Sequence, residues 1–354
     1  MYDIKVTKVT TSRASAVKFE NIPMGVEFSD HMFICDYEDG RWINPRIEPL
    51  ANLSMHPAAM ALHYGQAIFE GMKATKAPDG TPMIFRADDN AHRMNVSARR
   101  MGMPEFPEDL FVEALRQYVE LEHQWIPSQE GSALYLRPFM FADEPFIGMR
   151  AATKYKFMII ASPAGPFFSR PIKLYAETQY IRAAVGGTGE AKAAGNYAAA
   201  ILPTELAKKK GYDQVLWLDP EKFEYVQEVG TMNIFFKIGG KLITPDMNGA
   251  ILNGITRLSV IELLRDKGFE VEERPLSMNE VLEAFRNGTL EEAFGVGTAV
   301  SIALIEAIEY RGEVITFPKE TPVANDIKKT LDNIKTGKEP DKFGWMMPVT
   351  KVDA

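Results

Sequence analysis

Lys192 stands among unusually small residues, in the segment GGTGEAKAAGNYAAA at 186–200. Glycine and alanine let a planar ligand lie close to the backbone, and low polarity around the amine favours its neutral, nucleophilic form. A lysine in this setting suits a Schiff base with an aldehyde cofactor. An alanine-rich helix that carries one solvated lysine fits this segment equally well. Residues elsewhere in the chain must therefore distinguish the two interpretations.

The chemistry of pyridoxal phosphate requires a carboxylate at the pyridine nitrogen and a donor at the ring oxygen. Glu228 lies in the apolar run YVQEVGTMNIFF at 225–236, where a buried carboxylate needs a partner. A protonated pyridine nitrogen is such a partner, and the alternative is a turn residue that faces water. The phenol of Tyr197, five residues after Lys192, is the candidate donor to the ring oxygen.

Two turns could bind a phosphate group through backbone amides. Gly254, Ile255 and Thr256 precede the apolar helix pattern RLSVIELL, and free amides at a helix start bind anions. The turn GVGTAV at 295–300 offers the amides of Thr298 and Ala299. Thr256 could instead be an ordinary N-cap. Neither turn has the spacing of a P-loop or a dinucleotide fingerprint, so nucleotide binding is disfavoured.

Arg93, in the segment FRADDNAHRMNVSARRM at 85–101, could contact the same phosphate. Most helical arginines are simply solvated, so this residue carries little weight on its own.

Composition and residue spacing limit the classes of function that this protein can have. A net charge of −8 argues against a nucleic-acid surface, and a single cysteine, Cys35, excludes an internal disulfide. The five histidines show no metal-binding spacing. No apolar run has membrane-spanning length and the N-terminal residues do not resemble a signal peptide, so we expect a cytoplasmic enzyme with neither metal nor membrane.

The patterning along 354 residues predicts two domains of the α/β (α+β) class. We expect a small N-terminal domain at 1–165, a linker at 166–174 marked by the proline-rich segment PAGPFFSRP at 163–171, and a large cofactor-binding domain at 175–354. The elements expected in the first domain are a strand pair at 29–45 around Asp39-Gly40, helices at 89–101 and 107–124, and strands at 132–141 and 155–162. Those expected in the second are helices at 197–210, 256–267 and 278–286, strands at 213–218, 269–274 and 292–295, and a hairpin of 223–228 with 232–237.

Together these segments resemble the fold-type IV pyridoxal-phosphate enzymes, specifically the branched-chain amino-acid aminotransferases. The resemblance covers nearly the whole chain and rests on long ungapped matches. These are HYGQAIFEGMKA (63–74), RADDNAHRM (86–94), YLRPFMF (135–141), GGTGEAKAAGNYAA (186–199), GYDQVLWLD (211–219), EVGTMNIFF (228–236), ILNGITR (251–257), GVGTA (295–299) and FGWM (343–346).

The resemblance implies a two-domain fold and a role for each candidate residue. Lys192 would carry the aldimine and shuttle the substrate proton, Glu228 would hold the pyridine nitrogen, and Tyr197 would hold the ring oxygen. The phosphate would be bound by Arg93, Gly254, Ile255, Thr256 and Thr298. The substrate would be bound by Phe28, Tyr64, Phe69, Tyr135, Arg137, Phe167, Thr298 and Ala299.

The implied reaction is a ping-pong exchange of amino groups between L-leucine, L-isoleucine or L-valine and 2-oxoglutarate. An aromatic wall suits the aliphatic side chain, while Arg137, on the same strand face as Tyr135, suits the glutamate carboxylate. The resemblance also implies a homodimer. The alternatives are a D-amino-acid aminotransferase, an aminodeoxychorismate lyase, and a non-catalytic protein that has kept the fold.

Overall fold

The computed structural model describes residues 2–20, 22–166 and 170–349. The chain forms two compact units. The N-terminal unit comprises Met1–Phe167, Ala191–Ala194 and Asp332–Ala354, and the C-terminal unit comprises Phe168–Glu190 and Gly195–Leu331.

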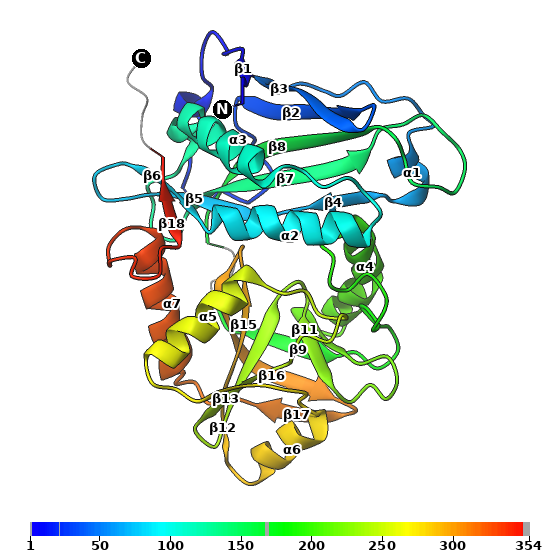
Figure 1. Cartoon of the computed structure of the whole chain (residues 1–354). Coiled ribbons are helices and arrows are strands. Elements are labelled where there is room, and N and C mark those ends of the chain that lie inside the picture. The colour runs from blue at the N-terminus through cyan, green and yellow to red at the C-terminus, as the bar shows by residue number, and fades with distance from the viewer. Residues whose placement is uncertain (1, 21, 167–169, 350–354) are drawn as a thin grey trace. The chain divides into compact units, whose positions relative to one another are not determined.

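In the N-terminal unit, a nine-stranded sheet of order β1-β3-β2-β8-β7-β5-β6-β18 forms among the described residues, with β4 paired to β7 (Figure 1). Its strands are β1 (Lys5–Val6), β2 (His31–Glu38), β3 (Arg41–Pro49), β4 (Ala67–Phe69), β5 (Met72–Lys76), β6 (Pro82–Phe85), β7 (Ala133–Ala142), β8 (Tyr155–Ala164) and β18 (Met346–Pro348). Its helices are α1 (Met60–Tyr64), α2 (Ala87–Arg100) and α3 (Glu108–Leu121).

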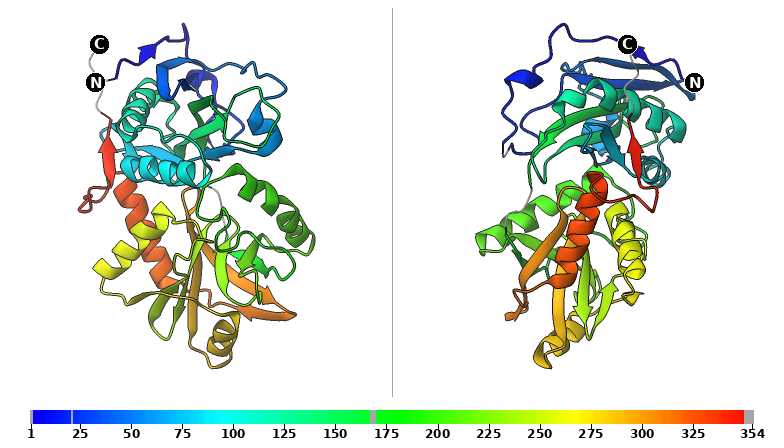
Figure 2. Two further views of the ribbon diagram at one scale, coloured as in Figure 1. Left: turned by 45° about the vertical axis from the view of Figure 1, so that its right-hand side comes forward. Right: turned by 90° about the vertical axis from the view of Figure 1, so that its left-hand side faces the viewer.

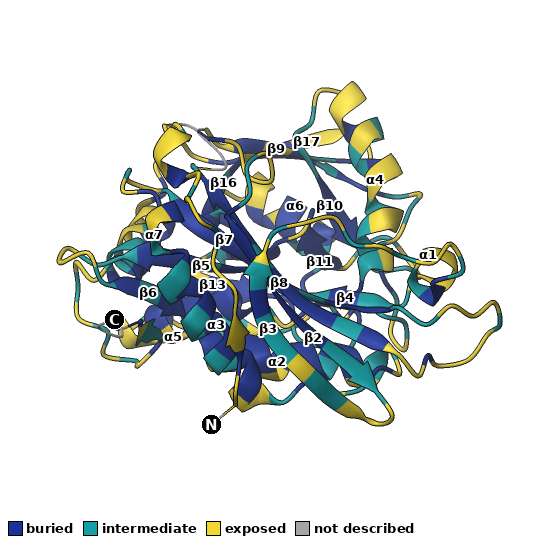
Figure 3. Cartoon of the chain, turned by 90° about the horizontal axis from the view of Figure 1, so that it is seen from above, coloured by how far each residue is buried: buried dark blue, intermediate teal, exposed yellow. Residues whose placement is uncertain are grey.

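The core of this unit lies between the sheet and helices α2 and α3. Phe33, Leu115 and Phe157 are fully buried there. The apolar residues of each helix recur at helical spacing, so they form one face, and this face packs against the inward side chains of the strands. Figure 3 shows β8 as largely buried, whereas β3 carries exposed and half-buried residues near the edge of the sheet.

In the C-terminal unit, a second nine-stranded sheet has the order β11-β10-β9-β16-β15-β12-β13-β14, with β17 paired to β16. Its strands are β9 (Ile172–Ala176), β10 (Gln214–Leu218), β11 (Val226–Val229), β12 (Asn233–Ile238), β13 (Lys241–Thr244), β14 (Val271–Glu273), β15 (Leu290–Gly297), β16 (Ser301–Tyr310) and β17 (Glu313–Thr316). Among the described residues, four α-helices lie wholly or mostly in this unit: α4 (Ala194–Lys209), α5 (Ile255–Asp266), α6 (Met278–Arg286) and α7 (Pro322–Lys335).

Most predicted elements are confirmed to within a few residues. Strands β2 and β3 form the expected hairpin, and its turn residues Asp39 and Gly40 have φ angles of 49° and 77°. Positive φ at both positions matches the twist of the flanking strands. Helix α3 begins directly after Pro107, and α6 has the predicted bounds. The mixed sheets and helices confirm the α/β class.

The predicted hairpin of 223–228 with 232–237 is wrong. Strand β11 pairs with β10, whereas β12 pairs with β13 and β15, and one isolated bridge joins Val229 to Met232. Strand β11 is buried throughout and β12 over its first four residues, so periodicity alone does not show which strand each one pairs with.

The division into two units also differs from the predicted domain bounds. Strand β9 begins at Ile172, so ordered structure starts inside the predicted linker of 166–174. Residues 332–349 belong to the N-terminal unit, where β18 pairs antiparallel with β6 (Figure 2). The segment Ala191–Ala194 belongs to that unit as well. A contiguous domain of 175–354 therefore does not describe the structure.

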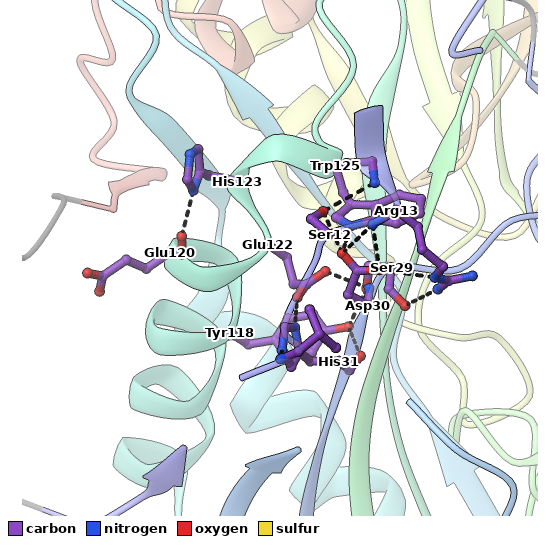
Figure 4. A network of polar contacts seen from close by, with 12 residues as sticks. Ser12, Arg13, Ser29, Asp30, His31, Tyr118, Glu120, Glu122, His123 and Trp125 are labelled. Atoms are coloured by element: carbon purple, nitrogen blue, oxygen red, sulfur yellow. Dashed lines mark hydrogen bonds and ion pairs between the residues drawn. The ribbon is translucent and has the colours of Figure 1, made fainter. Parts of the chain in front are cut away.

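A buried polar cluster ties the first residues of the chain to the N-terminal unit (Figure 4). The Asp30 carboxylate accepts hydrogen bonds from Ser12 Oγ at 2.6 Å, Trp125 Nε1 at 2.9 Å and Arg13 Nε at 3.1 Å. Asp30 N donates to Glu122 Oε2 at 2.9 Å. Burial would raise the pKa of Asp30, but the hydrogen bonds from Ser12, Trp125 and Arg13 outweigh it and hold this pKa below its usual value.

His31 continues the cluster toward helix α3. Its Nε2 accepts a hydrogen bond from Val9 N at 2.9 Å, so its ring proton lies on Nδ1 and is donated to Glu122 Oε1. Tyr118 donates to His31 O at 2.9 Å. Burial raises the pKa of Glu122 although its hydrogen bonds oppose the shift. The same cluster fixes a candidate pocket residue, because Arg13 Nη2 donates to Phe28 O at 2.9 Å.

We predict that Asp30→Asn lowers the free energy of unfolding at neutral pH by about 1.5–3 kcal/mol, the range for hydrogen bonds to a charged group. A carboxyl group whose pKa is lowered by folding stabilises above its unfolded pKa, and this contribution is lost as pH falls through the folded pKa. The difference between variant and native protein should therefore shrink from pH 7 to pH 3. Urea unfolding at both pH values measures it.

The exposed turn variant Asp39→Asn is the control and should change stability little at either pH, because asparagine tolerates a positive φ. An equal loss of stability by Asp30→Asn at both pH values would contradict an electrostatic role for this carboxylate.

Candidate functional site

Lys192 is held in the N-terminal unit by backbone contacts on both sides. Its amide donates to Ser97 Oγ of α2 at 2.9 Å, and its carbonyl accepts from Phe69 N of β4 at 3.1 Å. The neighbouring Ala193 bridges to Ile68. Lys192 is half-buried and precedes α4 rather than lying within it, so the alternative of a solvated lysine inside an alanine-rich helix is wrong.

The small residues around Lys192 have a packing role. Ala191 and Ala193 are 2% and 1% exposed and belong to the core of the N-terminal unit. A Cβ added to Gly189 would lie 2.1 Å from Ala250 O. Ala191, Ala193 and Gly189 are therefore small because the surrounding chain leaves no space, whereas a Cβ added to Gly195 would meet nothing within 4 Å. Room for a cofactor ring beside Lys192 stays a prediction.

An aromatic wall that carries a cation lies beside Lys192. Lys192 Nζ is 5.0 Å from the centroid of the Phe69 ring, and Arg137 Cζ is 4.5 Å from the same centroid. Arg137 Nη2 donates to Tyr135 Oη at 3.1 Å, which confirms that both residues share one face of β7. Arg137 Nε is buried and has no hydrogen-bond partner among the described residues. The wall thus combines apolar surface with an incompletely satisfied guanidinium.

Gly71 allows the tyrosine of this wall to take its position. A Cβ at residue 71 would lie 2.1 Å from Tyr135 Oη and 2.9 Å from its Cζ. A side chain there would displace the phenol and with it the acceptor of the Arg137 hydrogen bond. The segment FEGM therefore contributes a glycine with a steric function that the sequence did not reveal.

Arg93 has a carboxylate partner that the sequence analysis missed. Its Nε donates to Glu70 Oε1 at 2.9 Å and its Nη2 to Glu70 Oε2 at 2.6 Å. Glu70 is completely buried, and its amide donates to Pro138 O at 2.7 Å. This bidentate pair fixes the orientation of the guanidinium. The role of Arg93 toward a phosphate stays a prediction.

In the C-terminal unit, Glu228 is a buried carboxylate on β11, opposite Trp217 of β10. Its side chain is 4% exposed, so the alternative of a turn residue facing water is wrong. Oε1 accepts from Arg182 Nη2 at 2.6 Å and from Leu252 N at 2.7 Å. Oε2 has no hydrogen-bond partner among the residues that the structure describes. One oxygen of a buried carboxylate is thus left for a further donor.

The first predicted anion-binding turn lies at the start of α5. Gly254 is its N-cap and supplies no side chain, which leaves Thr256 inside the first turn and rules it out as the N-cap. In the described part of the chain, the amides of Ile255 and Thr256 have no hydrogen-bond acceptor. A Cβ at Gly254 would lie 1.9 Å from Asn233 Oδ1, so glycine is required for this close approach. The turn fits an anion.

The second predicted turn joins β15 to β16. Gly297 pairs with Ser301, which leaves Thr298, Ala299 and Val300 as a three-residue hairpin loop. Thr298 and Ala299 are half-buried, and Ser301 has a φ of 57°. The loop is held between two antiparallel strands.

For the remaining predicted residues, the structure gives the position and the burial of the side chain. Tyr197 is half-buried on α4, Phe28 is half-buried next to the buried Ser29, and Tyr64 ends α1 with 41% of its surface exposed. Phe167 lies outside the described residues. Within the described ranges, no helix combines the length and apolar character needed to cross a bilayer. No group of three or more His, Cys, Asp or Glu side chains there could hold a metal ion.

Comparison with known proteins identifies the family. Residues 67–308 match the model of the amino-transferase class IV family. The chain belongs to the class IV aminotransferases. Two curated members similar to this chain are the branched-chain-amino-acid aminotransferase 2 of Bacillus subtilis (strain 168) and a probable branched-chain-amino-acid aminotransferase of Staphylococcus epidermidis (strain ATCC 35984). The first is 43% identical over 97% of this chain and 96% of its own, and the second is 45% identical over 94% of each.

A solved class IV structure shares the architecture. The branched-chain aminotransferase of the thermophilic archaeon Thermoproteus uzoniensis, determined with norvaline, has a TM-score of 0.75 to this chain. It is 26% identical, and the match covers 90% of this chain and all of the other. The resemblance deduced from the sequence motifs and the fold-type IV architecture are therefore confirmed.

Proposed function

We propose that this class IV aminotransferase transfers amino groups between L-leucine, L-isoleucine or L-valine and 2-oxoglutarate in a ping-pong cycle with pyridoxal phosphate. The aromatic wall beside Lys192 carries this proposal, because it offers both kinds of contact that the two substrates need. Apolar ring surface favours an aliphatic side chain by about 1.5–3 kcal/mol when the side chain is fully buried. The Arg137 guanidinium, with its buried unpartnered Nε, suits a carboxylate.

The donor groups of the chain fit the cofactor. We assign Lys192 as the point of attachment and as the base that moves the substrate proton, Tyr197 to the ring oxygen, and Glu228 to the pyridine nitrogen. The hydrogen bonds of Glu228 support this, because both donors bind Oε1 and no described residue donates to Oε2. When bound, the cofactor supplies the electron sink that makes the substrate proton removable.

The remaining assignments follow from the two turns. We assign Arg93, Gly254, Ile255, Thr256 and Thr298 to the phosphate. The uncapped start of α5 supports this, since its amides and helix dipole favour an anion. The substrate α-carboxylate is assigned to Tyr64 and the amides of the Thr298-Ala299 loop, and the side-chain wall to Phe28, Phe69, Tyr135, Arg137 and Phe167.

Steady-state kinetics with a panel of amino donors and 2-oxoglutarate as acceptor test the proposal. We expect turnover with L-leucine, L-isoleucine and L-valine and none with D-alanine. Activity on D-alanine or on aminodeoxychorismate alone would replace the proposal by the corresponding class IV chemistry. Failure to bind pyridoxal phosphate would indicate a non-catalytic protein.

We predict that Arg137→Met raises KM for 2-oxoglutarate and L-glutamate by about tenfold or more, because a charge-assisted hydrogen bond of about 1.5–3 kcal/mol is lost. KM for L-leucine should change less, since methionine keeps apolar bulk in the wall. Separate KM measurements for both half-reactions check this. Arg99→Met, which removes a surface arginine paired with Glu105, is the control and should alter neither KM. An equal rise in KM for all substrates would contradict a selective role for Arg137.

We further propose that the chain works as a homodimer. Exposed apolar side chains gather in the N-terminal unit where a bridge between Ala59 and Pro145 brings α1 next to the loop of 143–153. Leu62, Ile147 and Met149 are 63%, 69% and 96% exposed. Several large apolar side chains exposed on neighbouring segments favour a protein interface. Sedimentation as a monomer with full activity would contradict the dimer.

We also propose a cytoplasmic location. Cys35 is buried, and burial raises the pKa of its thiol to about 12, so it is an inert core residue that calls for no oxidising compartment. Subcellular fractionation tests this, and enzyme found outside the cytoplasmic fraction would contradict it.

A further inference from the structure

Arg182 is a buried arginine of the C-terminal unit whose side chain is only 8% exposed. Besides its 2.6 Å hydrogen bond to Glu228 Oε1, Nη2 donates to Gly189 O at 3.1 Å. Nη1 lies 3.4 Å from Gly189 O and from Ala250 O. The guanidinium is therefore bound by the carboxylate of Glu228 and by two backbone carbonyls, which together restrict its orientation.

The carbonyls of Gly189 and Ala250, here called the carbonyl cradle, can both reach Arg182 only because residue 189 is a glycine. A Cβ at Gly189 would lie 2.1 Å from Ala250 O and 2.6 Å from Ala183 Cβ. Alanine at 189 would push these two segments apart and would separate the two carbonyls that orient Arg182. The cradle therefore offers a way to disturb Arg182 without changing either member of the ion pair.

The distribution of donors over Glu228 is uneven. Arg182 and Leu252 N both donate to Oε1, while Oε2 has no partner among the described residues. Two donors on one oxygen, one of them a guanidinium, fix the rotation of the carboxylate. The result is an oriented carboxylate with its second oxygen available.

We propose that Arg182 is a positioning residue for the cofactor: it holds the Glu228 carboxylate so that Oε2 would face the pyridine nitrogen. This proposal rests on the proposed function and adds a residue to that same site. Arg182 acts through Glu228 and does not itself contact the cofactor.

The affinity of the apoprotein for pyridoxal phosphate tests this role. We expect Arg182→Gln to raise the dissociation constant about tenfold or more, and Arg182→Lys, which keeps a charge without the fork of donors, to raise it less. Gly189→Ala should raise it too, by disturbing the cradle. The control Arg274→Gln removes an arginine that binds Glu272 and Glu280 in the same unit, and should leave the dissociation constant unchanged.

A double-mutant cycle separates positioning from a general structural effect. Glu228→Gln alone should weaken cofactor binding, and adding Arg182→Gln should then change the dissociation constant by less than about threefold, because Arg182 acts through the carboxylate. The double variant should also melt at a higher temperature than Arg182→Gln, since the single variant buries an uncompensated charge. Both comparisons use apoprotein whose folding has been verified by circular dichroism.

Two results would overturn the proposal. One is a native dissociation constant for folded Arg182→Gln, and the other is additive effects of the two substitutions in the double variant. If Arg182→Gln does not fold, Arg182→Lys and the double variant carry the test. Different results would refute the proposed function. These are failure of the native protein to bind pyridoxal phosphate, and a Lys192→Ala protein that retains the visible absorption band of the bound cofactor.

Discussion

Lys192→Ala is expected to lower kcat for transamination of L-leucine by at least about 10³-fold, within the range for loss of a positioned general base. The same variant should lack the visible absorption band that we expect of the native protein with pyridoxal phosphate, because the amine proposed to attach the cofactor is absent. Rapid-scan absorbance and steady-state assays measure both effects.

The structure makes this variant a clean test. The hydrogen bonds that join residue 192 to Ser97 and Phe69 come from its backbone, so they remain when the side chain is removed. We therefore expect a native melting temperature. Lys208→Ala is the matched control, because Lys208 is an exposed lysine at the end of α4 whose partner is Glu205. A Lys192→Ala protein with native turnover would refute the assignment of the lysine.

Glu228→Gln is expected to lower kcat by about 10²-fold or more, the size of effect caused by removing one preorganised electrostatic contact. Glutamine has the shape of glutamate but no charge, so it cannot balance a protonated pyridine nitrogen. It also leaves Arg182 buried without a counter-charge, for which the usual loss of stability is about 3–5 kcal/mol. Turnover, cofactor affinity and chemical unfolding should all be measured.

Two further variants test whether the charge and the position of the Glu228 carboxylate cause this loss of kcat. Glu228→Asp keeps the charge but withdraws the carboxylate by one methylene, so its kcat should lie between those of native protein and Glu228→Gln. Glu221→Gln removes an exposed carboxylate from the preceding turn and should have no effect on kcat. Native kcat in Glu228→Gln would show that the pyridine nitrogen needs no anionic partner here.

Local patterns predicted the secondary structure well where the physical cause is local. Helices α3 and α6 begin after Pro107 and Ser277 because these residues suit a helix start, and their apolar residues recur at helical spacing. The hairpin of β2 and β3 follows from two turn residues that accept positive φ. Each of these causes acts within a few residues, so the sequence displays it directly.

Strand pairing was predicted poorly because its cause is not local. Glu228 faces Trp217 in one pair of strands and Phe235 faces Phe294 in another, although residues 228 and 235 are close in sequence. Nothing in the run YVQEVGTMNIFF shows where its two halves separate. The return of residues 346–348 to β6 is equally invisible, since a three-residue strand carries almost no pattern.

The chemistry of the candidate site was readable because it depends on residue types that are unusual in their surroundings. A lysine among alanines and a carboxylate in an apolar run each imply a partner, and the motifs around them imply the family. The partners themselves were missed. Arg182, in the segment QYIRAAV, and Glu70, in IFEGM, are charged residues between apolar neighbours, and that signal could have marked them as buried ions.

The sequence by itself determined the family and marked the lysine and the carboxylate as candidates, because these inferences depend on side-chain chemistry and on motifs contained in short segments. Only the tertiary structure decided that Ser97 anchors Lys192, that Glu70 orients Arg93, and that Arg182 occupies one oxygen of Glu228 and leaves the other available. Such pairings depend on which distant segments pack together, and buried charges take their partners from that packing.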